Sequence, residues 1–163
     1  MISFVSVDEA PIPQGRRKLR QWLERIAINY GVKSIELSYV FGPSGWMADL
    51  NMKHLGHEGD TDILTFDYGD RDYGDSPSPQ LDSANAGLHL RSFGRVIIRG
   101  ECCISPDRVK NQSADWDSTP QEEMRRVMVH GLLHLIGFDD KKPGDQNQMR
   151  EAEDRALAIF ASL

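Results

Sequence analysis

The stretch HGLLHLIGFDD, from His130 to Asp140, joins an apolar helix to a set of metal-binding side chains. If the residues before Gly137 are helical, His130 and His134 stand four residues apart, so both imidazoles project from one face, one turn apart. Gly137 can adopt a left-handed conformation and end the helix, so that the chain doubles back and Asp139 or Asp140 reaches the same ion. Two imidazoles and one carboxylate suit zinc and leave a coordination position for water.

Two histidines at this spacing can also be ordinary residues of a core or its rim. Here their neighbours are apolar, and a glycine and paired aspartates follow immediately. This pattern favours a buried helix that carries metal ligands and ends in a tight turn. The apolar neighbours are Leu132, Leu133, Leu135 and Ile136.

The helix that carries the histidines has a clear predicted beginning. Thr119 is suited to cap it, Pro120 to occupy its first position, and Glu122 to complete a capping box. The positions that follow predict a core face made of Met124, Val127, Met128, Leu132 and Leu135.

The spacing HxxxHxxGxxD is similar to the HExxHxxGxxH signature of metzincin proteases, but Gly131 stands where their catalytic glutamate would be. It resembles more closely the HGxLHLxGxDH motif of the YbeY family, endoribonucleases of ribosomal RNA maturation. Asp140 replaces the third histidine of that motif, and aspartate is also a zinc ligand. The resemblance therefore implies one zinc ion per chain, held by His130, His134 and Asp140.

A second segment supports the same resemblance. The family has a stretch like LNxxxRxxDxPTDVLSF, which is matched here by Leu50, Asn51, Thr61, Asp62, Leu64 and Phe66. Leu55 aligns with the arginine of that stretch, so either Lys53, His54 or His57 substitutes for it or the catalytic scheme differs. The candidate catalytic residues are Thr61 and Asp62 from this segment and Asp139, which can orient a histidine or the water or simply cap its turn.

Length and charge limit the classes of function. With 163 residues the chain is expected to form a single domain over 1–163, and a net charge of −6 argues against a general nucleic-acid coat. RNA contacts must then come from local basic residues, which can equally be solvated helix faces. The candidate RNA-binding residues are Arg16, Arg17, Lys53, Arg125 and Arg126.

Adjacent Cys102 and Cys103 cannot form an ordinary disulfide framework, which fits a reducing, cytoplasmic location without membrane attachment. Both lie in a strand-like segment, and a role as thiolate ligands would require them to approach the histidines.

The order of periodic segments predicts an α+β domain: a small mixed four-stranded sheet packed with about five helices, as one pair of layers, with the metal site at the end of the central helix. The segment at about 69–92 is rich in Gly, Asp, Ser and Pro and is expected to be a flexible insertion. The expected strands are 2–7, 35–39, 63–68 and 93–105, and the expected helices are 16–30, 46–55, 105–113, 119–136 and 146–163.

The leading functional hypothesis, implied by the resemblance, is a zinc-dependent endoribonuclease specific for single strands, acting in ribosomal RNA maturation and ribosome quality control. Its partners would be single-stranded RNA and ribosomal RNA or the small ribosomal subunit.

One alternative is a non-catalytic ribosome assembly factor with a structural metal. Another alternative is a different zinc hydrolase. A peptidase is disfavoured because Gly131 stands where its catalytic glutamate would be, and a deaminase is disfavoured because the sequence lacks the Cys-x-x-Cys that such enzymes use to bind zinc. An iron oxygenase shares the ligand types, but its ligands would not lie on one helix.

Overall fold

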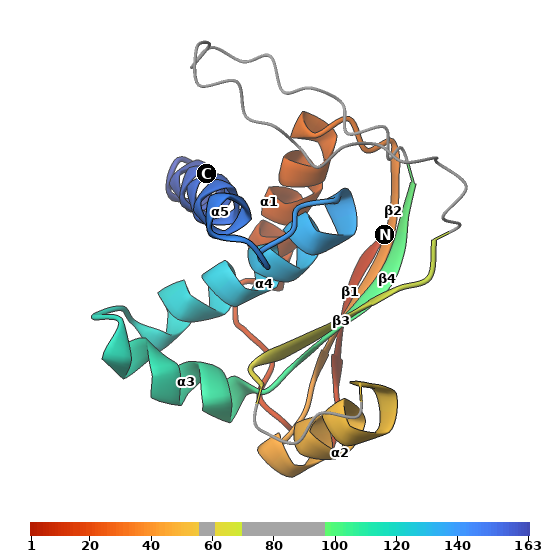
Figure 1. Cartoon of the computed structure of the whole chain (residues 1–163), viewed down its shortest axis with the longest axis vertical. Helices are drawn as coiled ribbons and strands as arrows, with labels where there is room; N and C mark the ends of the chain where they lie inside the picture. The colour runs from red at the N-terminus through yellow and green to blue at the C-terminus, as the bar shows by residue number, and fades with distance from the viewer. Residues whose placement is uncertain (56–60, 70–96) are drawn as a thin grey trace.

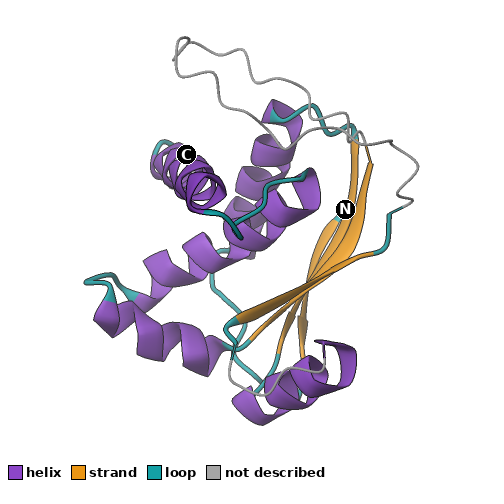
Figure 2. Ribbon diagram, in the orientation of Figure 1, coloured by secondary structure: helices purple, strands orange, loops and turns teal. Residues whose placement is uncertain are grey.

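The structure is a computed structural model that describes residues 1–55, 61–69 and 97–163. Within these residues, four strands form one sheet and five helices pack on it, which confirms the predicted α+β class (Figure 1, Figure 2). The strands are β1 (Ile2–Ser6), β2 (Ser34–Phe41), β3 (Ile63–Asp67) and β4 (Ile97–Ile104). The helices are α1 (Arg16–Asn29), α2 (Ser44–Leu55), α3 (Pro106–Asp115), α4 (Pro120–Ile136) and α5 (Pro143–Ala161).

The sheet is mixed, as expected, with the strand order β1-β2-β4-β3. β1, β2 and β4 run parallel, and β3 pairs antiparallel with β4 at one edge. β2 and β4 stay in unbroken register from Ser34↔Ile97 to Phe41↔Ile104. The described part of β4 is therefore one continuous strand without a bulge against β2.

Alternation along the strands separates two cores. Tyr39 and Cys102 face the main core with α1, α4 and α5, where the Tyr39 hydroxyl donates to the Met128 carbonyl at 2.8 Å. On the opposite face, Val40 and Cys103 pack with Met47 of α2. The prediction of one pair of layers is therefore incomplete, because both faces of the central strands are apolar and α2 covers part of the second face.

The predicted helix ends of α4 are confirmed. Thr119 Oγ1 accepts from the Glu122 backbone N–H at 3.2 Å, and the Glu122 carboxylate accepts from the Thr119 N–H at 3.0 Å, which completes the capping box. Gly137 ends the helix with φ +132°, in the positive range that favours glycine.

Several bounds differ from the predictions. α2 begins at Ser44, where Trp46 was expected, and α5 spans Pro143–Ala161, where 146–163 was expected. Leu163, the last residue of the predicted helix, lies beyond the end of α5 and is 45% exposed. Residues 93–96 of the predicted last strand and the predicted insertion after Gly69 lie outside the described residues. Among the helices that the structure describes, none is long and apolar enough to cross a membrane.

Candidate metal centre

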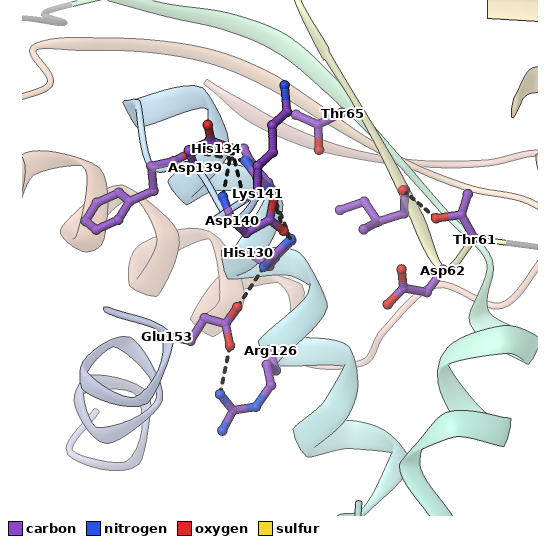
Figure 3. A network of polar contacts seen from close by, with 12 residues as sticks. Thr61, Asp62, Thr65, Arg126, His130, His134, Asp139, Asp140, Lys141 and Glu153 are labelled. Carbon is purple, nitrogen blue, oxygen red and sulfur yellow. Dashed lines mark hydrogen bonds and ion pairs between the residues drawn. The ribbon is translucent and has the colours of Figure 1, made fainter. Parts of the chain in front are cut away.

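The last turns of α4 and the connection to α5 bring three potential ligands together. His130 and His134 lie one turn apart, with 3.0 Å between their Nε2 atoms. Asp140 follows the Gly137 turn, and its Oδ2 atom lies 3.4 Å from each of these nitrogens. The three side chains converge in Figure 3, and they are the group among the described residues whose donor atoms could hold a metal ion.

The dimensions of this triangle suit a tetrahedral ion. Ligand atoms about 2.0–2.1 Å from zinc are separated from one another by about 3.3 Å in an ideal tetrahedron. The observed edges of 3.0, 3.4 and 3.4 Å are close to that value. Two neutral imidazoles and one carboxylate are also a donor set that zinc accepts, with a fourth position left open.

The outer nitrogens of both imidazoles are held by acceptors. His130 Nδ1 lies 2.7 Å from Glu153 Oε1, and His134 Nδ1 lies 3.0 Å from the Phe138 carbonyl oxygen. Because an ionised carboxylate and a carbonyl can only accept, each Nδ1 carries the proton and each Nε2 presents its lone pair to the centre. The rings are thus oriented for metal binding by groups that do not touch the metal.

Glu153 is the residue of this site that the sequence analysis missed. It is 6% exposed, and its second oxygen accepts from Arg126 Nη1 at 2.9 Å, so that it links His130 to Arg126 (Figure 3). A signal was present in the sequence: Glu153 stands beside Ala152 on the apolar face of α5, between Met149 and Ala156. An acidic residue on an apolar face requires a partner.

The surroundings of the two histidines shift their pKa values in opposite directions. Burial lowers the pKa of His130, but the hydrogen bond and negative charge of Glu153, with Asp140 and Asp62, outweigh it and leave the pKa raised. Burial and the neighbouring His130 lower the pKa of His134. Burial raises the pKa of Glu153, but its bonds to His130 and Arg126 prevail and hold that pKa below its ordinary value. Glu153 is therefore a carboxylate at neutral pH.

The structure places the three candidate catalytic residues differently. Asp139 Oδ1 accepts from the backbone N–H groups of Asp140 and Lys141, at 2.8 and 3.3 Å, so it caps its turn. Thr61 donates to the Ile63 carbonyl within its own loop. Asp62 shares a cavity of about 590 Å³ with His130 and Asp140, and Figure 3 shows the three side chains. The Asp62 carboxylate accepts from Gln112 at 2.8 Å. Of the three, Asp62 has the placement that suits a role in the reaction.

Gly131 and the cysteines have packing roles. A Cβ at Gly131 would lie 2.7 Å from Cys102 Sγ and 2.8 Å from Ile63 Cδ1, so this glycine allows α4 to approach the sheet closely. Burial raises the pKa of Cys102 to about 12, which keeps its thiol protonated. Both cysteines are buried, free and outside the metal-binding group.

The candidate RNA-binding residues are dispersed. Arg126 pairs with Glu153 and Asp154, at 2.9 and 2.8 Å, and its side chain is 25% exposed. Arg125 lies over the Phe160 ring near the end of α5. Asp140 precedes the beginning of that helix, so Arg125 and the candidate metal centre are at opposite ends of α5. Lys53 is exposed in the last turn of α2, which packs on the other face of the sheet from α4. Arg16 and Arg17 are exposed in the first turn of α1.

Fold and site together define an α+β protein with a group that can hold a metal ion, whose potential ligands come from the end of one helix and the turn that follows it. The model of the family described as Endoribonuclease YbeY matches residues 5–161. The chain belongs to this family. Membership confirms the expected class of enzyme, a hydrolase of the nuclease type.

Individual relatives match over most of the chain. The Endoribonuclease YbeY of Bacteroides thetaiotaomicron is 31% identical over 146 residues, covering 88% of each chain. That of Phocaeicola vulgatus is 30% identical over 164 residues, covering 99% of each. The solution structure of TM1509 from Thermotoga maritima shares the fold, with a TM-score of 0.56 at 18% identity, over 98% of this chain and 89% of that one.

Proposed function

We propose that this chain is a zinc-dependent endoribonuclease that cuts single-stranded RNA during ribosomal RNA maturation and ribosome quality control. Family membership supports the nuclease activity. The observation that carries the zinc dependence is the triangle of His130, His134 and Asp140, with both imidazoles oriented by acceptors on their outer nitrogens. The triangle adjoins a cavity that can admit part of an RNA strand.

Each residue has a definite task in this proposal. His130, His134 and Asp140 hold one zinc ion, and Glu153 and the Phe138 carbonyl keep the two rings in place. A bound zinc ion supplies a Lewis acid for a phosphoryl oxygen and lowers the pKa of an attacking water. Asp62, held by Gln112 in the same cavity, would accept the proton of an attacking water. Asp139 keeps the turn that presents Asp140.

A second candidate is a ribosome assembly factor whose metal is structural. The observation that favours it is Leu55, which stands where the family motif has an arginine, because leucine cannot neutralise a phosphate. In either case a cytoplasmic location fits, since the two free cysteines suit a reducing compartment.

The experiment is metal analysis of the purified protein, paired with cleavage of a single-stranded RNA before and after chelation. We expect about one zinc per chain and cleavage that chelator abolishes and zinc restores. His130→Ala and His134→Ala should lose the metal and the cleavage, whereas Asp140→His should keep the metal. Asp115→Ala, at the exposed end of α3, serves as the matched control for loss of a carboxylate.

The outcomes separate the candidates. Stoichiometric zinc without cleavage would favour the assembly factor. Metal content that neither histidine substitution changes would contradict the ligand assignment, and failure to bind zinc under any loading condition would contradict both candidates.

A further inference from the structure

We infer that Trp116, at the end of α3, and Arg150, in α5, form a subsite that binds an unpaired nucleobase and its phosphate beside the metal centre. This inference rests on the proposed RNA cleavage and adds to it the residues that hold the strand. Both side chains line the same cavity as His130 and Asp140.

Trp116 is exposed where an indole would ordinarily be buried. It is 63% exposed, whereas Trp22 in the main core is fully buried. Among the described residues, it is the one large exposed apolar side chain that lines the cavity of the metal centre. A large aromatic ring that stays open to solvent beside a reactive site is suited to stack on a ligand.

The backbone holds this ring in a defined place. The N–H groups of Trp116 and Ser118 both donate to the Ser113 carbonyl, at 3.3 and 3.2 Å, which closes the end of α3. Arg150 lies with its guanidinium carbon 5.5 Å from the centre of the Trp116 ring, a cation–π contact between α5 and the α3–α4 connection. The indole is thus oriented before any ligand binds, which reduces the entropy lost on binding.

The ligand class follows from stacking chemistry and charge. Every nucleobase has a π face, and a base can stack on an indole only when it is free of its own duplex, so the subsite accepts single strands with little regard to sequence. Among the described residues no carboxylate pairs with Arg150, unlike Arg126, whose guanidinium pairs with two carboxylates. Arg150 can therefore bind the phosphate that accompanies the stacked base.

The charge of the cavity fits a polyanion only when a cation is present. Four carboxylates and two guanidinium groups line it: Asp62, Glu123, Asp140 and Glu153, with Arg126 and Arg150. A divalent ion at the metal centre would balance this difference of two charges. The cavity then presents no net negative charge to RNA, and Arg150 provides local attraction at the side of the stacking ring.

The experiment measures steady-state cleavage of a short single-stranded RNA by the zinc-loaded protein. We expect Trp116→Ala to raise KM about tenfold with little change in kcat, and Trp116→Phe to keep most of the binding. Tyr68→Ala removes an aromatic ring that is 62% exposed outside this cavity and serves as the matched control. A series of RNAs can each carry one abasic nucleotide at a different position. At one position the missing base should raise the KM of the wild type, whereas the same RNA should not raise the KM of Trp116→Ala above its value for intact RNA.

Binding without cleavage provides an independent readout. A single-stranded DNA oligonucleotide should quench the tryptophan fluorescence of the zinc-loaded protein, and Trp116→Phe should abolish most of that quenching. Of the other two tryptophans, Trp22 is buried, and Trp46 in α2 packs on the other face of the sheet and does not line the cavity. Arg150→Gln should weaken this binding and lower its salt dependence by about one released ion. Arg155→Gln is the control on the same helix, since Arg155 pairs with Glu151.

Failure of the subsite differs from failure of the nuclease. An unchanged KM for Trp116→Ala, or quenching that persists in Trp116→Phe, would overturn the subsite and leave the nuclease proposal intact. Quenching that depends on Trp116 in a protein that cleaves no RNA would support the subsite and contradict the proposed nuclease.

Discussion

At the scale of single residues, the candidate metal centre depends on a glutamate outside the group of potential ligands. Glu153 accepts from His130 Nδ1 at 2.7 Å and is 6% exposed. Its negative charge increases the basicity of the ring, and its position selects the tautomer that turns Nε2 toward the ion. Arg126 in turn holds Glu153 from the other side, so the guanidinium supports the site through an intermediate carboxylate.

Glu153→Gln should weaken zinc binding about tenfold or more while the fold is retained. The amide can still accept a hydrogen bond from His130 but lacks the charge, and loss of such outer partners typically costs 10–100-fold in metal affinity. Zinc affinity measured by competition with a coloured chelator tests this expectation. Glu151→Gln, an exposed change two residues earlier in α5, is the control. Equal zinc affinity in the two variants would mean that Glu153 does not tune the ligand.

At the scale of elements, the position of α4 against the sheet determines where the histidines lie. Gly131 follows the first ligand directly and faces Cys102 of β4 and Ile63 of β3. A glycine at this position can leave room for substrate or permit close packing of the helix. The contacts of a built Cβ favour packing, because they are with side chains of the sheet.

Gly131→Ala should therefore destabilise the protein by about 1–3 kcal/mol, because the added methyl overpacks a filled interface. The gain in helix propensity, up to about 1 kcal/mol, offsets only part of this cost. Urea unfolding measures the difference. Gly144→Ala in the first turn of α5 is the matched control, since no atom lies within 4 Å of its built Cβ and the change should be neutral or stabilising. A Gly131→Ala protein as stable as wild type would show that α4 can move away from the sheet at no cost.

At the scale of the whole molecule, the metal site joins parts of the chain that are distant in sequence. α4 supplies two ligands, the following turn supplies the third, and α5 supplies Glu153. A bound ion would tie these elements together and stabilise the folded state over the unfolded chain.

Zinc at 100 times its dissociation constant should stabilise the fold by about 2.7 kcal/mol, seen as a higher Tm that chelator reverses. The increase should diminish as pH falls, because the carboxylates around His130 raise its pKa despite burial and protons then compete with zinc for that ring. Thermal unfolding with and without zinc at several pH values tests both the size of the Tm increase and its pH dependence. His134→Ala is the control, because zinc should not raise its Tm. A Tm that zinc raises equally in His134→Ala would indicate binding elsewhere.

The sequence alone determined the features that depend on neighbours within a few residues. The cap at Thr119, the end of the helix at Gly137 and the one-turn spacing of His130 and His134 are properties of a single helix, and the structure confirms the helix they define. The order of the periodic segments likewise predicted an α+β domain with a small mixed sheet, which the structure confirms.

Only the tertiary structure decided which distant side chains meet. Glu153 lies 23 residues after His130, and their contact depends on how α5 crosses α4, which the packing of the whole core sets. The same holds for Arg126, which pairs with Glu153, and for Arg150, which lies beside Trp116. The prediction of one pair of layers was incomplete for a related reason: α2 packs on part of the second face of the sheet, and which helix covers which face depends on the packing of distant segments.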